Sequence, residues 1–322
     1  RNVISDSDFK KKYGLSEKQF LTLKSNWEKL LKAEMSKREL PGIDNKIITS
    51  WNALTVIGLA DAYDAFGDKD YLIRAQKVFD FLEERLIVKD RVYHTYQEGS
   101  VKVEGFIEDY AFLIAAALKL YSSTTEIRYL NFADKFALKS MALFDDPNSE
   151  MFQYTSENSI YPSMVQIDDG VIPSPNSTMA NNLFLLGILL ENKIYAEQAD
   201  KMLKAASNDV LNSVSDYSVW ASLYASKVFP FVEIIVMGDK AKAYTSVLLK
   251  NDLPNSILQA SVSDVYLPLF ENRYVAGETL IYVCKNKVCR LPTSDLEVAL
   301  KEIKAIHNED DSNAIFRYIN KR

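Results

Sequence analysis

Two kinds of helical segment alternate along most of this chain, and this alternation constrains the fold more than any other feature of the sequence. From about Ser16 to Phe229, apolar residues recur at helical spacing. Segments 111–118 and 183–190 are apolar on every side, as in helices that are surrounded by protein. An amphipathic segment follows each of them, at 129–144 and at 195–211. The alternation predicts two concentric layers built from helical hairpins.

The spacing of the helices distinguishes this pattern from a helical solenoid. Tetratricopeptide arrays also alternate helices, but they keep a fixed period of about 34 residues. Here the spacing is irregular, and the long segments 88–107 and 145–176 separate the helix pairs. The first of them carries a strand-like piece, 92–96. Long ordered loops in a compact domain are more often functional than incidental, so we expect a site near these segments.

The period changes after Phe229. A buried strand, a helix, a second strand, a hairpin and a final helix are predicted at 231–238, 240–250, 256–262, 279–291 and 294–306. We therefore predict a mainly α protein, with part of an (α/α) toroid of helical hairpins at 1–229 and a small α/β subdomain at 230–322. The sequence has no glycine-rich nucleotide-binding motif, so no nucleotide site is predicted.

Composition excludes several partners. The 322 residues are 48% hydrophobic, enough for one large domain or two smaller ones. A net charge of -6, with both signs mixed along the chain, provides no basic stripe for nucleic acid or anionic membranes. No apolar run approaches the roughly 20 residues that span a bilayer, and the start lacks a secretory signal. We expect a cytoplasmic protein, and the opening residue Arg1, in place of methionine, fits a processed chain or a fragment.

Three polar segments, 41–46, 105–110 and 168–177, each precede a predicted inner helix. If the inner helices run parallel, their amino ends gather at one mouth of the ring, where 216–218 would join them. Carboxylates there can accept hydrogen bonds from hydroxyl groups, and aromatic faces can support a sugar ring. Glycoside hydrolysis needs one carboxylic acid and one carboxylate, which two separate loops can supply. The predicted catalytic residues are Glu108, Asp109, Asp168 and Asp169, with Asp44, Lys46, Trp51, Asn52, Tyr110, Ser174 and Asn176 as substrate-binding residues.

Each of these residues also has a structural interpretation. The helix dipole stabilises acidic side chains in a first helical turn, and Ser, Asp and Asn are preferred as caps. Asp109, Ser177, Asn52 and Asn176 can therefore be simple caps. Lys46 can pair with a buried carboxylate. For any one residue we favour the structural role, but the recurrence of a polar cluster before three inner helices favours a site.

Metal and nucleophilic chemistry receive little support from the sequence. His94 and His307 are too few for an ordinary zinc site or a histidine-pair mechanism, and no G-x-S-x-G motif occurs. We interpret His94 as structural and predict neither metal nor cofactor.

The two cysteines, Cys284 and Cys289, flank a predicted two-residue turn at Asn286-Lys287, which would place them opposite each other on a hairpin. A cross-strand disulfide is one interpretation. We favour the other, two reduced and half-buried thiols.

Four stretches together resemble the carboxy-terminal half of the YyaL / spermatogenesis-associated protein 20 family: RELPGIDNKIITSWNAL at 38–54, FIEDYAFL at 106–113, DDGVIPSPNS at 168–177 and YVCKNKVCRLP at 282–292. The resemblance implies an (α/α)6 toroid similar to those of six-hairpin glycosidases and N-acylglucosamine 2-epimerases, preceded in the family by a thioredoxin-like domain. It therefore implies a carbohydrate-active domain, a hydrolase or an epimerase, with a carbohydrate ligand.

Departures from the family pattern favour a second hypothesis. The usual Asp-Asp-Lys is Asp44-Asn45-Lys46, Trp-Asn-Gly-Leu is 51–54 (WNAL), and Pro-Ser-Gly-Asn-Ser is 173–177 (PSPNS), so one carboxylate and two glycines are missing. We find no thioredoxin-like part and only about four inner helices where a closed ring needs six. The alternative is a non-catalytic sugar-binding or protein-interaction module. Its open apolar edge would need the missing half or a second copy of the chain as partner.

Overall fold

The structure is a computed structural model that describes residues 4–39, 42–156 and 164–308. It divides into two compact units, residues 1–45 and residues 46–322. No helix in these described ranges is long and apolar enough to cross a membrane. The domain boundary predicted near residue 229 lies inside the second unit, where the last inner helix gives way to the sheet.

The described residues of the first unit form two helices, α1 (Asp6–Tyr13) and α2 (Glu17–Met35). Ser16 caps α2 in a capping box with Gln19, which explains why the helical pattern begins there. The preceding helix α1 is missing from the sequence prediction. It buries none of its side chains, so it carries no apolar stripe by which to recognise it.

The second unit begins with helical hairpins. The hairpin helices are α3 (Thr49–Phe66), α4 (Lys69–Arg85), α5 (Ile107–Thr124), α6 (Ile127–Phe144), α7 (Pro175–Leu189), α8 (Lys193–Asn212) and α9 (Ser218–Val228). Most of α5 and α7 is buried, whereas α4 buries only Ala75, Phe79 and Leu82. The predicted alternation of inner and outer helices is therefore confirmed.

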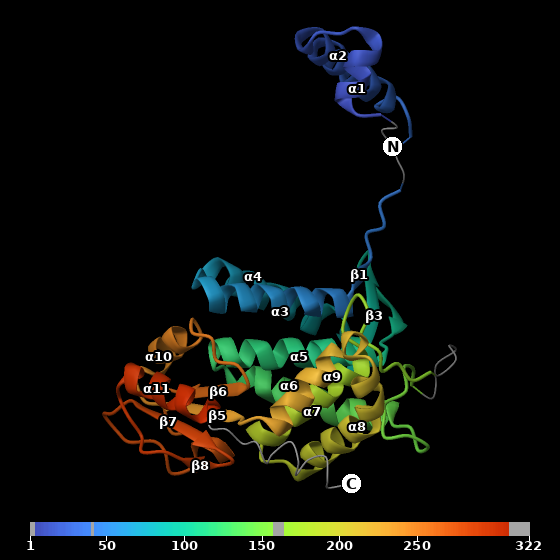
Figure 1. The fold of residues 1–322 in the computed structure, drawn as a ribbon. Helices are drawn as coiled ribbons and strands as arrows, with labels where there is room; N and C mark the ends of the chain where they lie inside the picture. Colours follow the sequence, from blue (N-terminus) through green and yellow to red (C-terminus); the bar gives the residue numbers. More distant parts are fainter. Residues whose placement is uncertain (1–3, 40–41, 157–163, 309–322) are drawn as a thin grey trace. The chain divides into compact units, whose positions relative to one another are not determined.

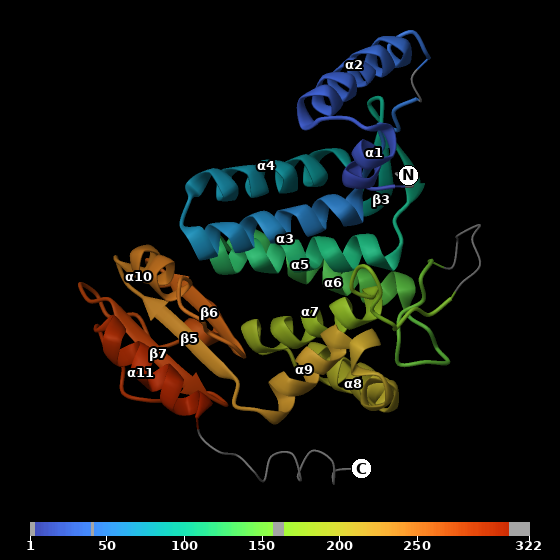
Figure 2. The same cartoon turned by 45° about the horizontal axis from the view of Figure 1, so that its top comes forward.

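Inner helices α3, α5, α7 and α9 follow one another, and α4, α6 and α8 return on their outer side (Figures 1 and 2). The described residues thus form part of an (α/α) toroid, with four inner helices. A small sheet lies beside the amino ends of α3 and α5. Its strands are β1 (Ile47–Ile48), β2 (Ile87–Val88), β3 (Arg91–Gln97) and β4 (Ser100–Glu104), with β3 paired to the other three.

An α/β part follows α9, as the sequence predicts. It contains β5 (Val232–Met237), α10 (Ala241–Leu248), β6 (Ser256–Ser261), β7 (Leu280–Lys285), β8 (Val288–Cys289) and α11 (Leu296–His307). The sheet order is β6-β5-β7-β8, with β5 parallel to β6 and antiparallel to β7. One face of β5 packs with α10 and α11, while the other, with Ile235 and Met237, reaches Ile188 of α7. Through α10 and β6 this part also contacts α5.

The hairpin of β7 and β8 corrects one interpretation. Cys284 pairs with Cys289 across the turn, as the spacing predicts, but the two sulfurs form a disulfide, so the favoured interpretation as reduced thiols is wrong. Asn286 and Lys287 both have positive φ, 52° and 66°, which is the geometry of a type I′ turn. This turn sets both cysteine side chains on the same face of the hairpin.

Candidate functional site

The amino ends of the inner helices meet, as the parallel arrangement predicts. Ser50 N, in the first turn of α3, donates to Asp109 Oδ1 of α5 at 3.0 Å. Val219 N, in the first turn of α9, donates to Asp169 Oδ2 just before α7 at 2.8 Å. The starts of α3 and α5 therefore lie side by side, as do those of α7 and α9.

Segment 151–156 connects the start of α5 to the start of α7. Ile107 N donates to Tyr154 O at 3.1 Å. Phe152 N donates to Asn176 Oδ1 at 2.7 Å, and Asn176 Nδ2 donates back to Phe152 O at 3.0 Å. The predicted ligand residue Asn176 is fully buried in these bonds, so its geometry is that of a structural link.

Asp109 is also held by the backbone. Its carboxylate accepts from Ser50 N at 3.0 Å and from Phe106 N at 2.9 Å, and its side chain is 0% exposed. The bond to Phe106 N caps α5, and the bond to Ser50 N ties α5 to α3. Because both oxygens serve backbone N–H groups, this geometry supports a positioning role for Asp109.

Glu108, its neighbour, points to a more accessible place. Its side chain is 15% exposed, and its carboxylate accepts from Ser50 Oγ at 3.3 Å and from the Tyr154 hydroxyl. Burial and the adjacent charge of Asp109 raise the pKa of Glu108, against the opposing effects of His94, Tyr154 and Ser50. Glu108 therefore keeps its proton to a higher pH than an ordinary glutamic acid.

His94 completes this cluster from β3, which the pairing of β1 with β3 brings to the start of α3. Its Nδ1 lies 2.9 Å from Asp109 Oδ2 and 4.0 Å from Glu108 Oε1. Because a carboxylate can only accept, Nδ1 carries the proton of this bond. Burial alone lowers the pKa of His94, but the hydrogen bond and charge of Asp109 and the charge of Glu108 outweigh burial and raise it.

His94, Glu108 and Asp109 are the one group among the described residues whose ligand atoms could surround a cation, all lying within 4.8 Å of one another. Both oxygens of Asp109 already accept backbone N–H groups. A cation at this group would compete with these N–H groups for the oxygens of Asp109.

Asp169 and Asp168 differ in the same way as Asp109 and Glu108. Asp169 accepts from Ser174 N at 2.8 Å, Ser177 Oγ at 2.7 Å and Val219 N at 2.8 Å, so it joins the starts of α7 and α9. Asp168 is exposed. Its predicted role as a catalytic partner of Glu108 stays a prediction.

The other predicted ligand residues divide by burial. Tyr110 is buried, and its hydroxyl accepts from Val92 N at 3.1 Å, while Ser174 is the buried cap of α7. Trp51 is 62% exposed at the start of α3, next to Ser50, and can offer its face to a ligand. Asn52, half-buried, donates to Ile48 O at 2.8 Å.

The segment before α3 is described only in part. Lys46 is exposed in the second unit, whereas Asp44 is exposed in the first, and Pro41 lies outside the described residues. Residues 157–163 of the long loop before α7 also lie outside them.

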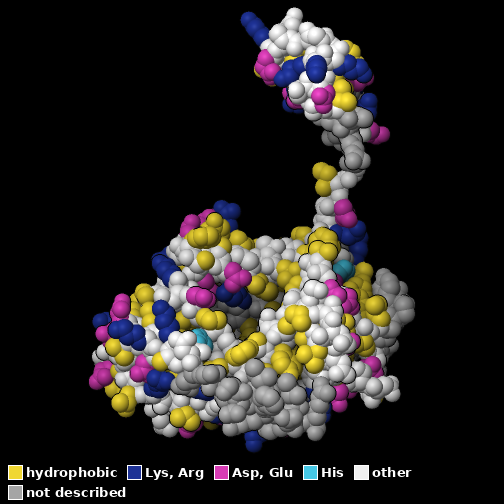
Figure 3. Space-filling model, in the orientation of Figure 1, with side chains coloured by type: hydrophobic (Ala, Val, Ile, Leu, Met, Phe, Trp, Pro, Cys, Tyr) yellow, Lys and Arg dark blue, Asp and Glu magenta, His cyan; other side chains and the backbone are white. Residues whose placement is uncertain are grey.

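A cavity of about 420 Å³ lies between the inner helices and β6. Figure 3 shows a hollow with hydrophobic side chains on its walls in this part of the molecule. Its walls come from α3, α5, α7, the start of α9 and β6. Representative lining residues are Leu54, Ile57, Phe112, Lys119, Thr178, Asn181, Asn182, Leu185, Val219 and Ile257.

Glu108 belongs to the stripe of α5 that lines this cavity. Phe112, Ala115, Lys119 and Ser122 follow it at i+4, i+7, i+11 and i+14, and all four line the cavity. Side chains at these spacings share one face of a helix. Glu108 therefore stands one turn before the cavity wall, at its amino end.

Sequence analysis missed several polar side chains of the cavity wall, among them Lys119, Thr178, Asn181 and Asn182. The helical spacing of the three residues on α7 could have revealed them, since they follow Ser174 at i+4, i+7 and i+8 and so share one helix face. Asn182 Nδ2 donates to Ala111 O at 2.8 Å, so this amide also ties α7 to α5.

The chain thus combines part of a helical-hairpin toroid with an α/β part. No protein-family model matches it. Over 310 residues it is 26% identical to spermatogenesis-associated protein 20 of Rattus norvegicus, covering 88% of this chain and 39% of that protein. The human protein of the same name is 27% identical over 314 residues, with the same coverage. The resemblance to this family is thereby confirmed.

A third relative is the uncharacterized protein B0495.5 of Caenorhabditis elegans. It is 24% identical over 329 residues, which cover 96% of this chain and 44% of that protein. The chain therefore spans less than half the length of the curated relatives it matches.

Similar solved structures include carbohydrate enzymes. A family 76 alpha-mannanase of Bacteroides thetaiotaomicron aligns with a TM-score of 0.46 and 16% identity, over 71% of this chain and 65% of that one. A cellobiose 2-epimerase of Bacillus thermoamylovorans aligns with a TM-score of 0.43 and 14% identity, over 58% of this chain and 46% of that one. Both scores are too low to support a conclusion about function.

Proposed function

We propose that this chain is a carbohydrate-active domain of hydrolase type, with its site at the amino ends of the inner helices and Glu108 as the proton donor. The observation that carries this proposal is the position of Glu108. Its carboxyl group is largely buried beside Asp109 and stands at the end of the stripe that lines the cavity of about 420 Å³.

The cavity suits a small polar ligand with apolar faces. Pockets of roughly 300–1,000 Å³ bind small molecules, and they combine apolar walls with a few placed polar groups. Phe112, Leu54 and Leu185 supply apolar surface, and Asn181 and Thr178 supply hydrogen-bonding groups. A sugar ring presents both kinds of surface.

The chemistry follows from the raised pKa of Glu108. A carboxylic acid that keeps its proton can donate it to the glycosidic oxygen as the bond to the leaving group breaks. Burial and the charge of Asp109 maintain this raised pKa, while the bonds of Asp109 to Phe106 N and Ser50 N hold it in place. The second carboxylate of such a mechanism would be Asp168, which is exposed before α7.

The test compares Glu108→Gln with Glu104→Gln, an exposed glutamate on β4. Binding of mono- and disaccharides is measured by calorimetry, and hydrolysis by release of reducing sugar. We expect Glu108→Gln to keep sugar affinity within about threefold and to lose roughly 10²–10⁴-fold in turnover. Glu104→Gln should behave as the parent chain. Equal turnover by the parent and Glu108→Gln would refute the role of Glu108.

A second candidate is the non-catalytic sugar-binding or protein-interaction module. It is favoured by the engagement of Asp109 and Asp169, two of the four predicted catalytic carboxylates, with backbone N–H groups. In that case the parent chain binds sugar without turnover, or a folded chain binds none of the panel. The same binding and hydrolysis assays distinguish these outcomes from the enzyme.

A further inference from the structure

The disulfide of the β7–β8 hairpin has two unequal sulfurs. Cys284 is fully buried against Ile235 and Phe270, whereas Cys289, at the edge of the sheet, is partly exposed. An external thiol can therefore reach Cys289 more readily than Cys284. Reaction with a disulfide depends on which sulfur is accessible and on which one leaves.

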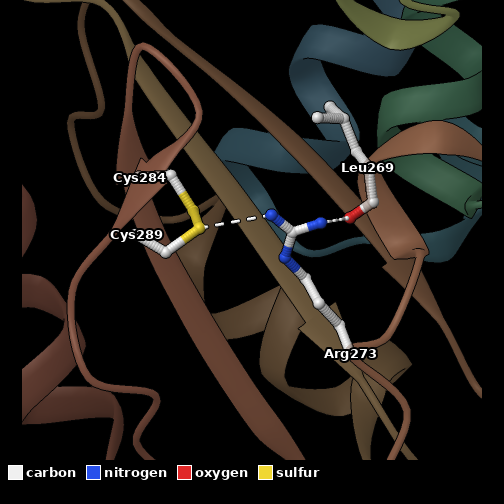
Figure 4. The surroundings of a disulfide bond; sticks show 4 residues. All are labelled: Leu269, Arg273, Cys284 and Cys289. Atoms are coloured by element: carbon white, nitrogen blue, oxygen red, sulfur yellow. Dashed lines mark hydrogen bonds between the residues drawn. A yellow bond between two sulfur atoms is a disulfide. The ribbon is translucent and has the colours of Figure 1, made fainter.

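Arg273 places a positive charge against the accessible sulfur. Its guanidinium donates to Cys289 Sγ at 3.3 Å and to Leu269 O at 2.6 Å (Figure 4). The Tyr282 hydroxyl donates to Arg273 O at 2.8 Å, and the guanidinium lies 5.8 Å from the Tyr282 ring centre. Arg273 is thus held at both ends, and a fixed cation next to sulfur stabilises a thiolate there.

Glu233 places a carboxyl group near the buried sulfur. It pairs with Cys284 across β5 and β7, so both side chains share one face, with Cβ atoms of such pairs roughly 4.5–5.5 Å apart. Glu233 is 6% exposed, and its Oε2 has no hydrogen-bond partner among the residues that the structure describes. The residue lines a cavity of about 450 Å³, whose wall includes the hairpin turn 285–287.

Burial is the largest influence on Glu233, and it raises the pKa of this side chain. The backbone N–H and charge of Lys287 and the charge of Arg273 oppose the shift, while Glu191 adds to it. Glu233 therefore carries a proton to higher pH than an ordinary glutamic acid. A buried carboxyl group with a free oxygen can pass that proton to a neighbouring thiolate.

We propose that Cys284 and Cys289 form a reversible redox site that a dithiol reduces, with Cys289 as the attacked sulfur and Glu233 as proton donor to Cys284. A thiolate of the dithiol attacks Cys289 Sγ. A mixed disulfide forms, the Cys284–Cys289 bond breaks, and its electron pair leaves on Cys284. Glu233 gives its proton to Cys284 and regains one from solvent.

The second thiolate of the dithiol then attacks the dithiol sulfur in the mixed disulfide. The dithiol leaves as its own disulfide, and Cys289 is released as a thiolate beside Arg273. Two electrons have passed from the dithiol to the cysteine pair. Of the two protons lost by the dithiol, one replaces the proton of Glu233 and the other stays in solvent.

A purely structural disulfide would need neither Arg273 nor Glu233. The type I′ turn and the ladder to β5 already align the hairpin. A charged donor at one sulfur and a buried acid opposite the other instead match the two thiolates that reduction creates.

The first experiment reduces the folded full chain with dithiothreitol and follows alkylation of each cysteine by peptide mass spectrometry. We expect reduction with unchanged circular dichroism, and Cys289 to react at least about tenfold faster than Cys284 at pH 7. The pH midpoint for Cys289 should lie about one unit below the roughly 8.5 of a free cysteine. Equal rates at the two cysteines, or reduction only on unfolding, would overturn the proposal.

Variants then separate the two supporting groups. Arg273→Gln should raise the Cys289 midpoint towards about 8.5, whereas Arg273→Lys should keep it low. The matched control is Arg290→Gln: Arg290 follows Cys289 in the sequence, and its guanidinium pairs with Glu302 at 3.6 Å. This substitution should leave the midpoint unchanged. An unchanged midpoint in folded Arg273→Gln contradicts the proposal. If Arg273→Gln does not fold, the alkylation test on the parent chain still decides the proposal.

The role of Glu233 has its own readout. Glu233→Gln should slow reduction by dithiothreitol at least about threefold at pH 7, and it should flatten the pH profile of that rate, since the amide has no proton to give. Glu271→Gln, at an exposed acid, is the control and should change neither. A parent-like pH profile in Glu233→Gln would remove Glu233 from the mechanism.

Discussion

His94 links the stability of the candidate site to pH. Its folded pKa is raised, so its stabilising contribution is complete below its unfolded pKa of about 6.5 and is lost as pH rises through the folded value. We expect His94→Gln to cost about 1.5–3 kcal/mol at pH 5.5, the value of a hydrogen bond to a charged group, and less at pH 8.5. Urea unfolding of both chains at the two pH values measures this. A larger cost at pH 8.5 than at pH 5.5 would contradict a raised pKa of His94 in the folded chain.

Adjacent aspartates before α7 should differ sharply in their effect on stability. Asp169→Ala removes the acceptor of Ser174 N, Ser177 Oγ and Val219 N, and we expect a cost of about 3 kcal/mol. Asp168→Ala, at an exposed position, should stay within about 0.5 kcal/mol of the parent chain. Chemical denaturation gives both values. Similar costs for the two substitutions would contradict the structural role of Asp169.

At the scale of elements, two glycines should respond oppositely to alanine. Gly238 ends β5 with a φ of 122°, and an added Cβ would lie 2.0 Å from Glu278 O, so Gly238→Ala should cost about 3 kcal/mol or more. Gly58 sits on the exposed side of α3 with no atom within 4 Å of an added Cβ. Gly58→Ala should stabilise the chain by about 0.5–1 kcal/mol, because alanine favours helix. Thermal unfolding of both variants tests the pair, and a gain for Gly238→Ala would refute it.

Across the whole molecule, burial predicts an order of opening. Helix α1 buries no side chain and α2 buries only Phe20, whereas most of α5 is buried. Regions with few buried contacts open at low free energy, so their amides exchange early. We expect hydrogen exchange measured by mass spectrometry to be complete in residues 6–35 while α5 is still protected. Protection of α2 equal to that of α5 would contradict this order.

The candidate site shows how far sequence patterns reach. The polar clusters before α5 and α7 do meet at one end of the helical part, because helix starts collect polar side chains and parallel helices bring these starts together. The pattern did not separate Glu108 from Asp109, or Asp168 from Asp169. In each pair one carboxylate holds backbone N–H groups from another helix. Those donors lie 59 and 50 residues away in the sequence, where no local pattern can reveal them.

By itself the sequence determined the helical hairpins, the change to an α/β part after Phe229 and the pairing of Cys284 with Cys289, because periodicity and turn residues act over a few neighbouring positions. Only the tertiary structure decided that the two cysteines form a disulfide and that Asn176 is a buried link to Phe152. It also decided that the face of α5 that begins at Glu108 lines a cavity. Each of these depends on side chains distant in sequence that meet in space. Burial and hydrogen bonding between such groups are fixed by packing, which local propensity does not encode.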